Sequence, residues 1–241
     1  MSRGRIRRIA LGVIIVAVAV VGILAGLRQV ARSRTYQLFG EIVAHVDTRD
    51  SVVALTFDDG PVAAVADDLV AVLRARDVHA TFFVTGQELA AAPAVARALV
   101  AAGHELGNHS YSHQHMVLKA PSTLRREIEQ TDALIRAAGE RGPIRFRPPY
   151  GYKLIGLPWL LARTDRTTVT WDVEPDSYPE VAATPEGIVA HVLARVRPGS
   201  IILLHPWYRS RATSLAAVPI LVDSLQARGY RVTTVGGLLD E

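Results

Sequence analysis

Short apolar runs with strand character alternate with segments of helical spacing through most of this chain. A run such as Ile201-Ile-Leu-Leu204 has no polar face, which is typical of a strand buried on both sides of a parallel sheet. Strands that alternate with helices predict such a sheet, covered by helices. The predicted strands are 52–57, 80–84, 144–147, 167–171, 201–204 and 231–235. The predicted helices are 62–76, 87–102, 122–138, 185–196 and 214–228.

The number of these units limits the architecture. About six or seven strand–helix units fit into the chain, fewer than the eight of a complete (β/α) barrel. We therefore expect an α/β fold in the form of a distorted or incomplete (β/α) barrel, preceded by an N-terminal transmembrane helix.

The N-terminal region differs in composition from the rest. Residues 9–27 are apolar and interrupted only by glycines, and roughly 20 such residues span a bilayer's hydrocarbon core. Four arginines and no acid precede this run, which places the N-terminus in the cytoplasm and the body outside. The run is longer than a signal peptide's apolar region, and residues 24–26 form a poor cleavage site, so an uncleaved anchor is favoured over a cleaved signal.

The expected organisation is a single-pass membrane protein with one extracytoplasmic domain, in the periplasm or at the cell surface. Its predicted parts are a basic cytoplasmic segment 1–8, a transmembrane signal anchor 9–27, a juxtamembrane connector 28–50 and a catalytic domain 51–241.

The charge of the body argues against nucleic acid as a partner. The net charge is +4, but residues 1–34 hold seven of the 27 basic residues and none of the 23 acidic ones. The remainder therefore has 20 bases against 23 acids, whereas a nucleic-acid-binding domain carries its excess positive charge on the folded body. The chain has no cysteine, so a metal site must use histidine and carboxylate ligands.

Five polar motifs carry the candidate chemistry. In chain order they are TFDDGP (56–61), HSYSH (109–113), RPPYG (147–151), WDVEPD (171–176) and LLHP (203–206). Four of the five directly follow an apolar run, and in a barrel of parallel strands such positions converge on one rim. We therefore expect the five motifs to surround one pocket.

Two adjacent carboxylates end the first predicted strand. Asp58 or Asp59 alone is as readily explained as the N-terminal cap of the next helix. Two such groups in a buried turn repel each other, however, which requires a compensating cation or a division of labour between metal ligand and base.

Two histidines four residues apart supply possible metal ligands. His109 and His113 could equally line a surface, because this spacing alone is a weak signal. With one carboxylate they complete a two-histidine, one-carboxylate set that leaves positions open for water and substrate. Such nitrogen and oxygen ligands fit Zn²⁺, and also Co²⁺, Ni²⁺ or Fe²⁺. His115 is expected to be a loop residue and His104 a structural one.

Two further residues have both a structural and a functional interpretation. His205 ends an apolar run, where it either caps the strand or donates a proton with a tuned pKa. Arg147 is either a surface charge or the partner of a catalytic carboxylate.

Taken together and in this order, the motifs TFDDGP, HSYSH, RPPYG and LLHP resemble those of the polysaccharide deacetylase family, also called the NodB homology domain or carbohydrate esterase family 4. The similarity covers about residues 51–239. It implies a distorted (β/α) barrel that uses a divalent metal, zinc in the first place, to remove N-acetyl or O-acetyl groups from polysaccharides.

The resemblance also implies roles for individual residues. Asp58 would be the general base, oriented by Arg147, and His205 the general acid. The backbone N–H of Tyr150 would stabilise the oxyanion. The implied metal ligands are Asp59, His109 and His113, and the implied pocket walls are Trp171, Leu203 and Pro149.

The fourth motif departs from the family pattern of Asp followed directly by Trp, in which the Asp pairs with the motif arginine. Asp176 is the first candidate partner for Arg147, with Asp172 and Glu174 as alternatives, and Tyr178 is the candidate replacement for the Trp.

The leading hypothesis is a membrane-tethered deacetylase of an extracytoplasmic glycan such as peptidoglycan, a chitin-like oligomer or an exopolysaccharide. One alternative is a catalytically silent glycan-binding domain on the same barrel. Another is a metal-dependent hydrolase of a different non-peptide C–N bond or of an acetyl ester.

Overall fold

The computed structural model describes residues 3–240. Residues 1–2 and 241 lie outside the described part, so the start of the predicted 1–8 segment and the end of the predicted 51–241 domain fall there. The strands are β1 Ile42–Val43, β2 Val52–Asp58, β3 Thr81–Val84, β4 Glu105–Asn108, β5 Thr168–Val169, β6 Ile201–Leu204 and β7 Arg231–Thr233. The helices are α1 Arg3–Arg32, α2 Ala63–Arg74, α3 Gly86–Ala91, α4 Pro93–Ala101, α5 Pro121–Ala137, α6 Gly156–Arg163, α7 Pro185–Leu193, α8 Ala212–Ala227 and α9 Val235–Leu239, with 3-10 turns η1 Pro149–Gly151 and η2 Arg209–Arg211.

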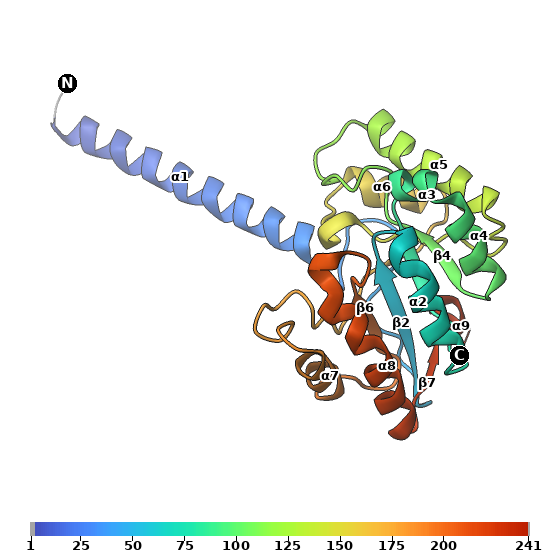
Figure 1. Ribbon diagram of the computed structural model, residues 1–241. Coiled ribbons are helices and arrows are strands. Elements are labelled where there is room, and N and C mark those ends of the chain that lie inside the picture. The colour runs from blue at the N-terminus through green and yellow to red at the C-terminus, as the bar shows by residue number, and fades with distance from the viewer. Residues whose placement is uncertain (1–2, 241) are drawn as a thin grey trace.

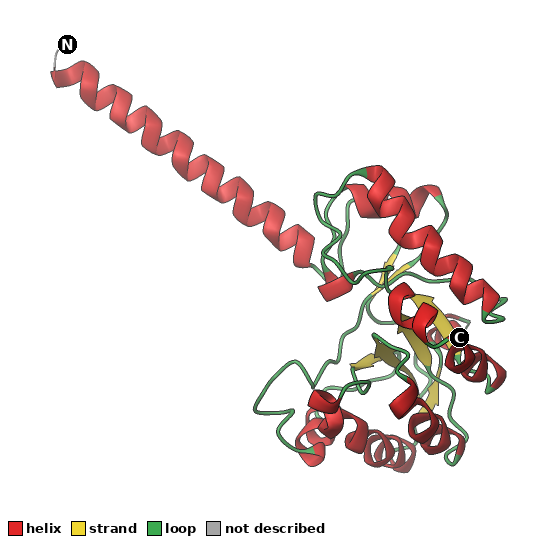
Figure 2. Cartoon of the chain, turned by 45° about the horizontal axis from the view of Figure 1, so that its top comes forward, coloured by secondary structure: helices red, strands yellow, loops and turns green. Residues whose placement is uncertain are grey.

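β2 is the centre of a parallel sheet that curves into an irregular barrel. It pairs with β3, β6 and β7, and β3 pairs with β4. Beyond β4, the single residue Phe146 bridges Asn108 to Thr168 of β5. A few residues later Val173 bridges back to Ile202 of β6, so the chain from β5 to Val173 closes the ring. The helices surround these strands (Figures 1 and 2), and the expected distorted (β/α) barrel is confirmed.

The two faces of β2 show how sequence alternation positions the site. Val53, Leu55 and Phe57 point outward into the main apolar cluster beneath the helices. Val52 and Ala54 belong to the inner cluster. Because side chains alternate along a strand, Thr56 and Asp58 share the inward face with them. The inward row of this strand is therefore apolar in its first half and polar where it reaches the rim.

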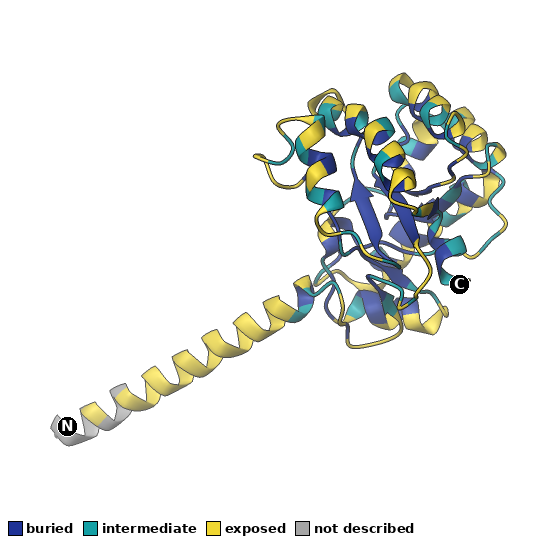
Figure 3. Cartoon of the chain, turned by 90° about the horizontal axis from the view of Figure 1, so that it is seen from below, coloured by how far each residue is buried: buried dark blue, intermediate teal, exposed yellow. Residues whose placement is uncertain are grey.

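Burial follows the expectation for strands covered on both sides. All four residues of β6 are buried, as are all seven of β2, and Figure 3 shows the strands as a dark core. α9 contributes Val235 and Leu238 to the inner cluster and so fills the barrel from the end opposite the rim. A third cluster joins α5 and α6 to Phe146.

α1 projects from the domain as a single long helix (Figure 1). A candidate membrane span covers Leu11–Arg32, and none of it is buried against the domain over its apolar window. Among the side chains of this helix whose burial is described, only the end is covered, where Ala31 is 6% exposed. This exposure distinguishes α1 from the core helix of a soluble protein.

Some predicted elements were wrong in extent. The predicted strand 144–147 is only a one-residue bridge at Phe146, because Pro148 and Pro149 follow at once and proline cannot donate to a ladder. The predicted helix 87–102 is two helices divided at Pro93, which starts α4. The predicted strand 231–235 stops at Thr233, since Thr234 caps α9.

Other elements were not predicted. β4 was not predicted because Glu105-Leu-Gly-Asn108 is short and has polar ends, so the segment contains no apolar run. β1 lies in the predicted connector, where it pairs with β5. α6 and α9 were also missed.

The close approach of β3 to β4 gives a stability prediction. A Cβ at Gly107 would lie 2.5 Å from ring atoms of the buried Phe83. Gly107→Ala should therefore destabilise the fold by about 1–3 kcal/mol, because the ring has no free space. The Gly142→Ala control meets only the end of the Glu140 side chain at 3.3 Å and should stay within about 0.5 kcal/mol of the native chain. Urea unfolding measures both, and equal midpoints would contradict the proposed close packing.

Candidate metal and catalytic site

Three parallel strands end at the same rim and bring the motifs together. Asp58 is the last residue of β2, His109 follows β4 directly, and His205 follows β6. Their side chains line a hollow of about 380 Å³. Its full lining is Arg34, Asp58, Asp59, His109, His113, Tyr150, Trp171, Glu174, Ser177, His205 and Arg211.

Asp59, His109 and His113 form the one cluster of at least three possible metal ligands found among the described residues. Each offers one ligand atom, and these atoms lie within 4.8 Å of one another. Asp59 Oδ1 is 3.4 Å from His113 Nε2 and 4.0 Å from His109 Nε2. Asp59 has a left-handed backbone with φ 70. Both adjacent carboxylates thus approach His109, with Asp58 Oδ2 at 3.6 Å and Asp59 Oδ1 at 4.0 Å from its Nε2.

The protonation of His109 suits a metal ligand. Its Nδ1 lies 2.7 Å from the backbone carbonyl of Arg147, which fixes Nδ1–H as the donor and leaves the Nε2 lone pair facing Asp59. Burial, with a smaller contribution from His113, lowers the pKa of His109 to about 3. A buried neutral imidazole, a second imidazole and a carboxylate match the ligand set of catalytic zinc sites, so these residues fit a divalent ion.

Buried polar contacts hold the loop that carries the two histidines. The Glu127 carboxylate of α5 accepts the backbone N–H groups of Tyr111 and Ser112 at 3.0 and 2.8 Å. The Ser110 hydroxyl accepts the His113 N–H at 3.1 Å, and His113 itself has a left-handed φ of 53. The HSYSH segment is therefore a braced loop after β4, and the close spacing of its histidines does not come from a helix.

Arg147 is the most buried charge of the site. Its side chain is fully buried, with the guanidinium 4.0 Å from the centre of the Phe83 ring. Nη1 donates to Asp58 Oδ1 at 2.6 Å and to the Thr56 hydroxyl at 2.9 Å, and Nη2 donates to the Thr170 carbonyl at 3.0 Å. Burial lowers the pKa of Arg147, and the charge of Asp58 opposes this shift. The pair fixes the carboxylate of Asp58, whose other oxygen lies 3.6 Å from His109 Nε2.

Asp176 is the partner of His205. Its carboxylate accepts the His205 backbone N–H at 2.7 Å and lies 3.1 Å from His205 Nδ1, and Ser214 donates to it at 2.9 Å. Burial acts to lower the pKa of His205, but Asp176, with help from Asp58 and Asp59, raises it to about 9. His205 is thus held as an imidazolium that can give up a proton at the pocket.

The predicted partner of Arg147 was therefore wrong. Asp176 lies beyond the β5–Val173 crossing and beside the end of β6, where it meets His205 and not Arg147. Asp172 accepts the backbone N–H of Ile201 at 2.9 Å and so binds the main chain of β6. Glu174 accepts the Trp171 indole N–H at 2.8 Å. No fourth-motif carboxylate hydrogen-bonds Arg147 among the described contacts, whereas Asp58 does, in line with the orienting role that the resemblance implies for Arg147.

The predicted pocket walls are found in part. Trp171 and Tyr150 line the hollow, and Tyr150, with a left-handed φ of 60, stacks on His115 at 4.2 Å between ring centres. Leu203 does not line it, because its side chain packs in the inner cluster beneath Trp171. Pro149 is buried and is also absent from the lining. Tyr178 does not replace a wall residue, since it stacks on His191 at 5.3 Å.

Three lining residues were missed by the sequence reasoning. Ser177 donates to Glu174 at 2.6 Å, and Arg211 donates to the Asp176 carbonyl at 2.6 Å. Arg34 reaches the pocket from the predicted connector and pairs with Glu174 at 2.7 Å. No signal marked Arg34, because its contact spans 140 residues of sequence.

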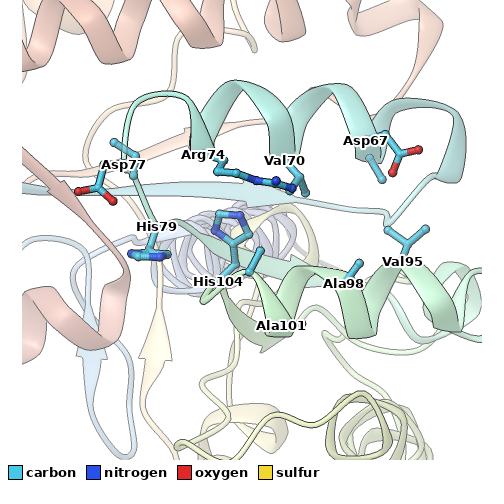
Figure 4. A pocket seen from close by; sticks show the side chains of 12 residues that line it. Asp67, Val70, Arg74, Asp77, His79, Val95, Ala98, Ala101 and His104 are labelled. Atoms are coloured by element: carbon cyan, nitrogen blue, oxygen red, sulfur yellow. The ribbon is translucent and has the colours of Figure 1, made fainter.

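A larger hollow of about 700 Å³ lies away from the motifs, between α2 and α4. Figure 4 shows small side chains such as Ala98 and Ala101 facing α2 across it. His104 also lines this hollow; its Nδ1 accepts the Ala80 N–H at 3.3 Å, and burial lowers the pKa of His104 to about 4. His104 is thus a structural residue near the starts of β3 and β4, far from the rim.

The link between Asp176 and His205 can be tested by titration. Asp176→Asn removes the charge that keeps His205 protonated, so burial should dominate and the pKa of His205 should fall by more than one unit. Ser214→Ala removes one hydrogen bond but leaves the carboxylate and should shift the pKa much less. NMR titration of the histidine ring signals measures both values, and an unchanged His205 pKa in Asp176→Asn would refute the assignment.

Comparisons with known proteins identify the family of this chain. The family model described as polysaccharide deacetylase matches residues 45–167. The chain is 34% identical to a chitooligosaccharide deacetylase of Bradyrhizobium, over 75% of this chain and 87% of that protein. It is 30% identical to a peptidoglycan-N-acetylglucosamine deacetylase of Bacillus cereus, over 83% of this chain and 93% of that protein.

A solved structure extends the comparison to the fold. BA3943 of Bacillus anthracis, described as a CE4 family pseudoenzyme, aligns with a TM-score of 0.72 and 27% identity, covering 83% of this chain and 69% of that one. By its motifs, its fold and these matches, the chain belongs to the polysaccharide deacetylase family, the NodB homology or carbohydrate esterase family 4 hydrolases that act on carbon–nitrogen bonds other than peptide bonds.

Proposed function

We propose that this protein is a metal-dependent deacetylase that removes N-acetyl groups from an extracytoplasmic polysaccharide, peptidoglycan or a chitin-like oligomer in the first place. One observation carries the proposal: a metal-ligand set, a carboxylate fixed by arginine and a protonated histidine line the same hollow. The named activities of the relatives from Bradyrhizobium and Bacillus cereus support this choice of substrates.

Asp58 is assigned as the general base. Its Oδ1 is engaged by Arg147 at 2.6 Å, while Oδ2 faces the ligand cluster, 3.6 Å from His109 Nε2. The free oxygen can therefore take a proton from a water molecule at the cluster, and Arg147 keeps the carboxylate from rotating away.

Asp59, His109 and His113 would hold the divalent ion, with Zn²⁺ favoured and Co²⁺, Ni²⁺ or Fe²⁺ compatible. Such an ion supplies Lewis acidity for the acetyl carbonyl. The backbone N–H of Tyr150 is assigned to the oxyanion, since Tyr150 lies on the lining beside His113.

His205 is assigned as the general acid. It lines the hollow together with Asp58, and its hydrogen bond to Asp176 keeps it protonated. It can therefore deliver a proton to the leaving amine of the sugar; His205 then regains a proton from solvent water, Asp58 releases the one it took, and Asp176 keeps the imidazole in place.

We also assign α1 as an uncleaved membrane anchor, with the N-terminus in the cytoplasm and the barrel outside. The helix exposes its apolar side chains along the candidate span, for example Ile15 at 60% and Val18 at 67%, which is unfavourable in water and suits lipid. The polymers on which the relatives act support an extracytoplasmic location.

The division of roles between the two carboxylates and the histidines can be tested by substitution. Asp58→Asn should lower turnover by about 10²–10⁴-fold or more while metal binding is kept, because the base is lost and the ligands remain. His113→Ala should lose both. His115→Ala is the matched control, since His115 belongs to the same loop but not to the ligand cluster, and it should keep its metal. Acetate assays and metal analysis measure the three variants; near-normal turnover in Asp58→Asn would make the base assignment wrong.

The activity itself is tested with the full chain in detergent micelles. Acetate release from N-acetylglucosamine oligomers and from peptidoglycan should be abolished by a chelator and restored by Zn²⁺ or Co²⁺. No acetate from any glycan, with metal shown to be bound, would favour the silent glycan-binding domain or a different scissile bond.

A further inference from the structure

The end of α1 is fastened to the barrel through main-chain groups. The carbonyl of Ala31 accepts the Lys153 backbone N–H at 3.0 Å, and the carbonyl of Ser33 accepts the buried Lys153 ammonium. The carbonyl of Arg34 accepts the Thr170 hydroxyl at 2.6 Å. The helix therefore passes into the domain without a flexible spacer.

The same segment forms part of the catalytic pocket. The Arg34 guanidinium pairs with Glu174 at 2.7 Å and lies 4.6 Å from the centre of the Trp171 ring. Arg32 lies over the Tyr152 ring at 5.7 Å, just after the η1 turn that carries Tyr150. The tether thus ends at the rim, as Figure 1 shows, and not at the far end of the barrel.

The length of the helix sets how far the pocket lies from the hydrocarbon core of the bilayer. The apolar run ends at Leu27, and Ala31 follows four residues later, or about 6 Å along a helix. The headgroup layer on each side of a bilayer is roughly 5–8 Å thick. If residues 9–27 span the hydrocarbon core, the docked segment 31–34 lies at headgroup level, and the pocket it lines lies beside it.

Exposed apolar side chains gather next to this segment. We define the tether-side surface as Tyr36, Leu38, Phe39, Leu118, Ile155 and Trp159, which are all exposed and reach 90% at Leu118.

These residues come from three neighbouring parts of the chain. The first three directly follow the docked segment, and the next residue, Gly40, packs against Ala162 of α6, the helix that carries Trp159. Ile155 lies two residues after Lys153 and shares a small hollow with Leu118. The surface therefore borders the point where the tether leaves the domain.

Charge and composition suit a lipid surface. Arg28 and Arg32 are exposed at the end of the span, where cations meet anionic headgroups. Aromatic side chains such as Tyr36 and Trp159 are favoured at the membrane–water interface. A protein partner would also cover apolar groups, but the helix that leaves from this same side brings the bilayer to it without another component.

Building on the membrane anchor and deacetylase activity proposed above, we propose that the tether-side surface lies on the bilayer and that the pocket takes acetylated glycan at the membrane surface, while the glycan is still joined to a membrane lipid. Free glycan in solution is then the poorer substrate, because the pocket lies at headgroup level and the docked tether cannot lift it away.

Site-directed spin labelling tests the contact in the full chain. The native sequence has no cysteine, so each label has a single attachment point. Leu118→Cys and Ile155→Cys place labels on the tether-side surface, and Ile220→Cys on α8 is the control, with a native side chain that is 39% exposed. In nanodiscs that contain anionic phosphatidylglycerol, the first two labels should be several-fold less accessible to a water-soluble nickel chelate, and more accessible to oxygen, than the third. Equal accessibility at all three positions would overturn the contact with lipid.

A substrate comparison tests the consequence for function. The full chain in nanodiscs is given one N-acetylated oligosaccharide in two forms, free in solution or joined through a diphosphate to a polyprenyl lipid in the same disc. Acetate release from the lipid-linked form should exceed that from the free form by at least tenfold in kcat/KM.

The matched variant carries eight Gly and Ser residues inserted between Arg28 and Gln29, which leaves residues 31–34 and the pocket unchanged. A flexible spacer of this length reaches about 15 Å, enough to lift the rim from the headgroups. The preference should fall towards one, because the rate on the lipid-linked form falls while the rate on free oligosaccharide stays the same or rises. An equal rate on both forms in the native chain, or a preference that the spacer does not change, would overturn the inference. Acetate from neither form would instead overturn the deacetylase function, and the spin labels would still report on the membrane contact.

Discussion

The Arg147 guanidinium, buried inside the barrel, is the charge on which the rest of the site depends. It joins β2, through Asp58 and Thr56, to the chain after β5, through the Thr170 carbonyl, and its own carbonyl orients His109. A fully buried charge is costly unless it is paired, so the contacts of Nη1 and Nη2 also support folding, although the buried Nε has no hydrogen-bond partner among the described residues. The arginine thereby ties the base, one metal ligand and two parts of the barrel wall to one position.

Around this arginine, the site separates two carboxyl–cation pairs. Arg147 with Asp58 is fully enclosed, whereas His205 with Asp176 lies at the pocket with the imidazole 19% exposed. The first pair fixes Asp58 as a proton acceptor, and the second holds His205 as a proton donor. Their separation on different strands lets one small pocket contain a group that takes a proton and a group that gives one.

The sequence reasoning was most successful where chemistry follows an apolar run. Asp58 ends β2 and His205 directly follows β6, and the position of a residue at the end of a buried parallel strand is fixed by that strand. It failed where the barrel is irregular. One bridge at Phe146 replaces a strand, and β4 is too polar to recognise, yet these two segments position Arg147 and His109. The partner of Arg147 was misjudged for the same reason, because the path of the chain from Thr170 to Asp176 depends on pairings of single residues.

The contacts that fasten α1 to the barrel also have a consequence for comparing such proteins. On the tether, the acceptors for Lys153 and Thr170 are the main-chain carbonyls of Ala31, Ser33 and Arg34, and a carbonyl is present whatever the side chain. Residue 33, which is only partly buried, can therefore change without loss of these hydrogen bonds, whereas the buried Ala31 leaves room only for a small side chain. An alignment would show most of this segment as a variable linker, and only the small residue at 31, with the lysine and the threonine on the barrel, would reveal that the anchor is fixed in place.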